Sequence, residues 1–108
     1  MSDASKRFSL LATVAGLALV VCGTSTFAAS AERGKQLARR LCSVCHIVRA
    51  GQSPGVAPAP TFRSIARSSQ FRAKGAKLLW EVHGTMPNFA LTGEEADDVA
   101  AYIRSLAK

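Results

Sequence analysis

Five consecutive residues, Cys42-Ser-Val-Cys-His46, constrain the fold of this chain more than any other feature. Two residues between the cysteines allow one tight turn that directs both sulfurs to the same side, and the imidazole of His46 follows directly. Cys-x-x-Cys-His is the attachment motif of c-type haem, in which the two thiols add to one porphyrin and the histidine reaches the iron. We therefore expect one covalently attached haem c, held by Cys42, Cys45 and His46.

The first 31 residues have the layout of a secretory signal peptide. Two basic residues precede an apolar run over residues 8–21, and small and polar residues follow it. The run is shorter than the roughly 20 residues that a membrane-spanning helix needs, although an uncleaved membrane anchor remains the alternative. Small residues favour cleavage after Ala28 or after Ala31. We expect a periplasmic protein whose folded domain comprises residues 32–108.

Only two cysteines are expected in the mature domain. Cys22 ends the apolar run, but Val21 before it is too bulky for the signal of a lipid-anchored protein, so Cys22 should leave with the signal peptide. Cys42 and Cys45 are then committed to one motif, which excludes a disulfide framework. Because a domain this small buries little apolar surface, a bound apolar macrocycle would complete its core.

The chain is basic, with 14 Lys and Arg against 7 Asp and Glu and a formal net charge of +7. Loss of the signal peptide removes two basic residues and one acidic residue, which leaves +6. Export argues against nucleic acid as a partner, and positive charge fits redox partners with an acidic docking surface. A merely solvated surface is the alternative. The basic residues in question are Arg39, Arg40, Arg63, Arg67, Arg72, Lys74 and Lys77.

Apolar periodicity predicts helices and no strands, hence an all-α chain without repeats or a second domain. The expected helices cover residues 32–41, 62–67, about 73–83 and a C-terminal segment that begins after Thr92. Thr92 and Glu95 form a capping box, and Gly84 would end the preceding helix. Gly34 lies inside the first helix, where we expect another helix to approach closely, because glycine otherwise destabilises a helix.

The second axial ligand of an iron held by His46 is expected to be Met86. Apart from Met1 it is the only methionine, it lies in the loop before the last helix, and Pro87 would stiffen the backbone beside it. A thioether suits iron that changes oxidation state, and His/Met ligation raises the reduction potential. Met86 as a core side chain is the alternative. His83 is the other possible iron ligand, although a surface or helix-end position is the simpler expectation.

These segments resemble the class I bacterial cytochromes c over residues 32–108. The resemblance rests on the helix that leads into Cys42, the segment from Gly55 to Pro58, the pair Met86-Pro87, and the C-terminal segment 101–106. It implies a small cytochrome c fold, in which helices and loops wrap around one covalently bound haem.

The resemblance also implies roles for individual residues. The carbonyl of Pro58 would accept a hydrogen bond from His46, Met86 would bind the iron, and the last helix would cross the first near Gly34. Separately, Trp80 could lie against the haem or donate towards a propionate, whereas a place in the core, as for Tyr102, is the simpler alternative.

The expected function is electron transfer between respiratory or dehydrogenase partners, without an enzymatic activity of its own. A cytochrome subunit of a periplasmic oxidoreductase and a haem-based small-ligand sensor are the alternatives. A peroxidase is not expected, because no distal acid–base pair is evident. A thioredoxin-like redox site lacks its strand-rich context here, and a zinc site would need ligands beyond His46 and His83.

Overall fold

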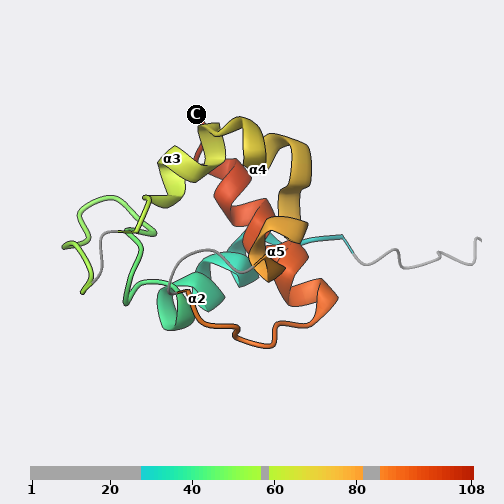
Figure 1. The fold of residues 1–108 in the computed structure, drawn as a ribbon, viewed down its shortest axis with the longest axis horizontal. Coiled ribbons are helices and arrows are strands. Elements are labelled where there is room, and N and C mark those ends of the chain that lie inside the picture. The colour runs from blue at the N-terminus through green and yellow to red at the C-terminus, as the bar shows by residue number, and fades with distance from the viewer. Residues whose placement is uncertain (1–27, 57–58, 82–85) are drawn as a thin grey trace, which may run out of the picture.

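The computed structural model describes residues 28–56, 59–81 and 86–108, which form helices and loops (Figure 1). In chain order the elements are α2 (Ala31–Leu41), α3 (Phe62–Arg67), α4 (Ser69–Lys74), the 3-10 helix η1 (Gly75–Trp80) and α5 (Gly93–Ser105). These described residues contain no strand, so the predicted all-α class is confirmed. None of the described helices has the length and apolar character needed to cross a membrane.

The two longest helices begin at side-chain caps. Ser30 is the N-cap of α2, and its side chain accepts a hydrogen bond from the backbone N–H of Arg33. Thr92 and Glu95 form the predicted capping box at the start of α5, with 2.9 Å from Thr92 N to Glu95 Oε2 and 3.2 Å from Glu95 N to Thr92 Oγ1. Each cap satisfies backbone donors that a helix N-terminus leaves without partners.

Helices α2 and α5 pack against each other through Gly34. This residue is buried, and a Cβ added to it would overlap the backbone carbonyl of Asp98 on α5. The close approach predicted at Gly34 is therefore confirmed. The contact brings Ala38 of α2 into the same buried cluster as Val99 and Ile103 of α5.

The helix expected over residues 73–83 differs from the structure. The helical run starts earlier, because the side chain of Ser68 accepts from Phe71 N and caps α4. It changes character at Gly75, whose φ of +55° lies in the region that favours glycine and ends α4. The chain continues as the 3-10 helix η1, which ends at Trp80. Gly84, the predicted stop, lies outside the described residues.

An aromatic cluster ties the middle of the chain to α5. Phe62 and Tyr102 are both buried, with ring centroids 6.3 Å apart. The hydroxyl of Tyr102 donates a hydrogen bond of 2.5 Å to the carbonyl of Val48, in the segment that follows His46. Tyr102 is thus a core aromatic, as expected, and it anchors that segment to the last helix.

Candidate functional site

The two cysteines lie in a tight turn at the end of α2. Cys42 is the C-cap of the helix, and its backbone N–H donates to Ala38 O at 2.9 Å. The N–H groups of Cys45 and His46 both donate to Cys42 O, at 3.2 and 2.8 Å, so the turn closes on itself. Cys42 is buried, Cys45 is partly exposed, and neither forms a disulfide. The helix end therefore fixes the two sulfurs and the imidazole in one short segment.

Burial controls the chemistry of Cys42. Desolvation first, and the neighbouring Cys45 second, raise the pKa of the Cys42 thiol to about 11. A thiol with so high a pKa is protonated at neutral pH and is therefore a weak nucleophile before the haem is attached. Within the described ranges no group of three or more His, Cys, Asp or Glu side chains is assembled that could hold a metal ion. The other residue considered for zinc, His83, lies outside them.

The imidazole of His46 is held by a backbone carbonyl. Its Nδ1 lies 2.6 Å from Pro60 O, and because a carbonyl oxygen only accepts, Nδ1 is the donor. The contact favours the tautomer with its proton on Nδ1, in which the lone pair of Nε2 can bind a metal. The residue is 8% exposed, and the ring of Phe62 packs at a centroid distance of 5.6 Å.

The carbonyl beside Nδ1 belongs to Pro60. Pro58, which the family resemblance predicts as the partner, lies outside the described residues, so that prediction stays untested. A backbone hydrogen bond of 2.9 Å from Phe62 N to Ile47 O places the residues just before α3 beside His46. The chain therefore returns to the imidazole at the entry to α3.

One residue of the site was missed by sequence reasoning. Gln52, partly buried in the loop after His46, donates from Nε2 to His46 O at 2.7 Å and to Ser43 O at 3.2 Å. Its Oε1 accepts from Val48 N at 3.0 Å. One amide side chain thus ties the cysteine turn to the segment behind it. The only sequence signal is a long polar side chain among small residues and prolines, which is too weak to identify a role.

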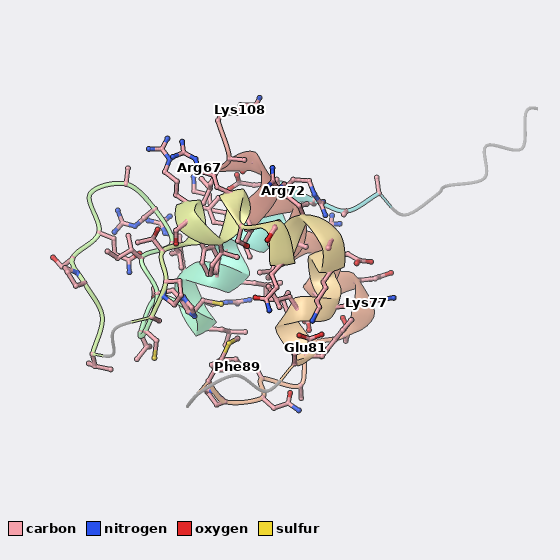
Figure 2. All side chains as sticks on the ribbon, turned by 45° about the horizontal axis from the view of Figure 1, so that its top comes forward. Arg67, Arg72, Lys77, Glu81, Phe89 and Lys108 are labelled. Atoms are coloured by element: carbon pink, nitrogen blue, oxygen red, sulfur yellow. The ribbon has the colours of Figure 1, made fainter. Side chains whose placement is uncertain are left out.

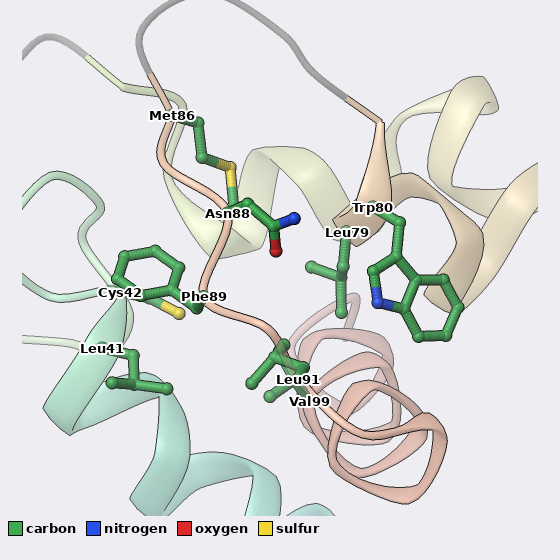
Figure 3. A pocket seen from close by; sticks show the side chains of 9 residues that line it. All are labelled: Leu41, Cys42, Leu79, Trp80, Met86, Asn88, Phe89, Leu91 and Val99. Atoms are coloured by element: carbon green, nitrogen blue, oxygen red, sulfur yellow. The ribbon is translucent and has the colours of Figure 1, made fainter.

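Two adjoining cavities share Cys42, Leu79 and Met86 as lining residues. The first also has the imidazole of His46 in its wall, and the rest of that wall is apolar, formed by Phe62, Ile65, Phe71, Leu78 and Ile103. The second is shown in Figure 3, where the side chains of Met86 and Cys42 lie along one side of it. Its other lining residues are Leu41, Trp80, Asn88, Phe89, Leu91 and Val99.

The structure therefore brings together most of the residues predicted for the site. Cys42, His46 and Met86 line one cavity, although Met86 is distant from the other two in sequence. Trp80 lines the adjoining cavity and is 48% exposed, so it is not the core aromatic that was the simpler expectation. His83 and Pro58 lie outside the described residues.

These side chains fit a haem. The walls are largely apolar, as a porphyrin face requires, and they carry thiol, imidazole and thioether groups, which are the donor types of c-type haem sites. Among the described residues, every buried side-chain nitrogen and oxygen already has a hydrogen-bond partner. The buried polar side chains of the described residues are thus satisfied within the protein. The apolar cavity walls, with their sulfur and nitrogen donors, can therefore contact the bound haem.

The described fold and site define a small helical haem protein, and comparison with known proteins gives its family. The sequence model of the family "Cytochrome c" matches residues 31–107. Cytochrome c-552 of Bradyrhizobium diazoefficiens is 44% identical over 91 residues, which cover 83% of this chain and 88% of that protein. No solved structure gives a match.

The chain belongs to the cytochrome c family. It resembles the class I bacterial members, as its motifs indicated, and it carries covalently bound haem c. It is therefore a c-type cytochrome, and its role is to carry electrons.

The basic residues singled out in the sequence are all exposed. Arg67, Arg72 and Lys77 point outward from the helices in Figure 2. Lys74 forms an ion pair with Glu81, with 2.8 Å between Nζ and a carboxylate oxygen. Such exposed ion pairs contribute little to stability. The main effect of these basic residues is the positive electrostatic potential that they create at the surface.

Proposed function

We propose that this cytochrome is an exported, six-coordinate carrier of single electrons, with its haem iron held between His46 and Met86. The observation that carries the proposal is the position of Met86, whose side chain lines the same cavity as His46 and Cys42. Haem supplies the one-electron chemistry when bound. The protein's own residues hold it, orient it and exclude water from most of its surface.

Each residue of the site has a separate task in this proposal. Cys42 and Cys45 form the thioether bonds, and their shared turn fixes one edge of the ring. His46 binds the iron through Nε2 because Pro60 O holds Nδ1. Trp80, which lines the adjoining cavity and is half exposed, would lie against the ring.

Electrons are proposed to enter and leave near the cysteine turn. Cys45 is partly exposed and Val44 is 56% exposed, so this edge lies closest to solvent. The partners are respiratory or dehydrogenase proteins of the periplasm that present acidic docking surfaces to the basic residues described above. The N-terminal signal pattern supports export, and the positive surface supports partners of opposite charge.

Substitution of the axial thioether tests the ligand set. In Met86→Ala the ferric protein should lose the weak far-red absorption band of His/Met haem while the haem stays covalently attached. Its reduction potential should fall, because the thioether stabilises the ferrous state. Leu79→Ala is the matched control, because Leu79 lines the same cavity and cannot bind iron. Persistence of the band in Met86→Ala would show that the axial assignment is wrong.

The same spectra separate the carrier from a haem-based ligand sensor. A sensor needs an open or labile iron position, whereas Met86 closes that position in the proposed site. The reduced wild-type protein should therefore bind carbon monoxide poorly at neutral pH, and Met86→Ala should bind it readily. Ready binding by the wild type would favour the sensor.

A further inference from the structure

The residues just before α2 are built into the fold, although the sequence pattern allows cleavage on either side of them. Ser30 caps α2 through its side chain, and its backbone carbonyl accepts from Gly34 N at 3.0 Å. The backbone N–H of Ser30 donates to Asp98 Oδ1 at 2.6 Å. Asp98 is 4% exposed and lies on α5, so Ser30 connects the start of the first helix to the last one.

Arg33 completes this junction. Its Nε donates to Asp98 Oδ2 at 2.9 Å, and its terminal nitrogen lies 3.3 Å from Asp98 Oδ1. The same nitrogen also lies 3.4 Å from Ala28 O, the longest of these contacts and the one that cleavage after Ala28 would remove. These hydrogen bonds surround a buried carboxylate, which has to be paired to be tolerated in the interior.

Cleavage after Ala31 would dismantle the junction. It removes Ser30, which leaves Arg33 N and Gly34 N without their capping partners and Asp98 without one of its donors. The new ammonium group would sit on Glu32, at the helix end where the dipole disfavours positive charge. Ala31, which packs against the core, would also be lost.

The two peptide bonds also differ in accessibility. Ala28 and Ala29 are exposed and precede the helix, whereas the bond between Ala31 and Glu32 lies in the first turn of α2. Exposed segments with small residues are preferred sites of proteolysis. The bond after Ala28 lies in such a segment, whereas the bond after Ala31 lies inside the helix that the mature protein has to form.

We propose that the signal peptide is cleaved between Ala28 and Ala29, so that the mature protein keeps Ser30 as the cap of α2 and as a donor to Asp98. The small residues Thr26 and Ala28 occupy the positions that a signal peptidase reads. This assignment rests on the export included in the proposed function.

The first test is the N-terminus of the haem-loaded protein, produced from the full chain in a host that exports and matures c-type cytochromes. N-terminal sequencing and intact mass should give Ala29. A protein that begins at Glu32 overturns the assignment and leaves export intact. A haem-loaded chain that retains its N-terminal segment overturns the assignment in favour of the uncleaved membrane anchor, whereas a chain recovered only from the cytoplasm overturns export.

Two substitutions in the full chain give a second, independent test. Ala28→Leu places a bulky residue before the proposed bond and should abolish cleavage there, whereas Ala31→Leu should leave Ala29 as the N-terminus. Loss of cleavage in Ala31→Leu with normal cleavage in Ala28→Leu would overturn the proposal.

The thermal stability of the mature protein shows whether it still contains Ser30. Ser30→Ala should lower the thermal unfolding midpoint of the mature protein by about 4–8 °C, as expected for the loss of one N-cap in a domain of this size. Ser25→Ala is the control, because both candidate cleavages remove it. If Ser30→Ala has the same midpoint as the wild type, Ser30 is absent from the mature protein and the proposal is wrong.

Discussion

His46 shows how a few hydrogen bonds decide the chemistry of a residue in this protein. Pro60 O fixes the ring nitrogen Nδ1, which directs Nε2 to the iron. Gln52 binds the backbone of the same residue through His46 O and also reaches Ser43 O. The motif supplies the imidazole, and residues from two later loop positions orient it.

Substitution of Gln52 tests the second of these supports. Gln52→Glu should lower the free energy of unfolding of the haem-loaded protein by about 1–3 kcal/mol, because the carboxylate cannot donate to the two carbonyls that the amide now satisfies. The loss should shrink at acidic pH, where a protonated carboxyl can donate. Denaturant unfolding measures it.

The control for Gln52 is Gln36→Glu, the same chemical change at an exposed position of α2. Equal losses in the two variants would mean that added negative charge, and not the lost amide donors, causes the effect. In that case Gln52 does not hold the cysteine turn.

Among the elements, the junction of α2 and α5 holds the two ends of the domain together. Gly34 permits the backbones to approach, and Asp98 binds Ser30 N and the guanidinium of Arg33 across the contact. The hydrogen bond from Arg33 first, and that from the Ser30 backbone second, hold the pKa of Asp98 below its ordinary value. A depressed carboxyl pKa means that ionised Asp98 stabilises the folded state.

Asp98→Asn should therefore destabilise the protein in a pH-dependent way. At pH 7 the loss should be about 1–2 kcal/mol, at the low end for charged hydrogen bonds because Arg33 is half exposed. The contribution of Asp98 is fully present above its unfolded-state pKa of about 3.9 and disappears as the pH falls through its lower folded-state pKa. The deficit of the variant should thus shrink towards pH 3.

Denaturant unfolding at neutral and acidic pH measures this deficit. Asp97→Asn, which removes a charge from the neighbouring exposed position of α5, is the control. A deficit of the same size at both pH values would show that Asp98 acts through packing and not through its charge.

For the whole molecule, the haem serves as part of the core as well as the redox group. The buried cluster of α2, α3, α4 and α5 borders cavities whose walls are largely apolar. In a domain this small, those walls need a partner to be buried against, so we expect haem attachment and folding to be coupled. The outer surface carries exposed basic residues, so we expect the docking of redox partners to depend on long-range electrostatics.

The salt dependence of electron-exchange rates tests whether the positive surface charge steers redox partners. Electron exchange with a protein partner can be imitated with small redox-active ions of known charge. Electron exchange with the hexacyanoferrate anion should slow markedly as ionic strength rises from about 0.01 to 0.15 M, since the screening length falls from about 30 to about 8 Å. Exchange with a cationic ruthenium ammine complex should accelerate instead. Stopped-flow rates that are insensitive to salt for both ions would contradict electrostatic steering.

Local patterns predicted the parts of this protein that depend on short stretches of chain. The haem motif, the first helix, the helix at residues 62–67 and the capping box at Thr92 could be read directly, because each depends on neighbours within one or two helical turns. The scarcity of methionine, and then the family resemblance, predicted that Met86 belongs with His46, and the two side chains line one cavity.

Contacts between distant segments had no local signature and appeared only in the folded chain. Pro60 reaches His46 because Phe62 N is hydrogen-bonded to Ile47 O, and Ser30 is needed because Asp98, far along the sequence, is buried beside it. Helix α4 ends at Gly75 through a positive φ, which periodicity does not encode. The sequence by itself was therefore sufficient to predict the haem and the residues that bind it. The groups that orient those residues and hold the helices together depend on tertiary packing, because they come from distant parts of the chain.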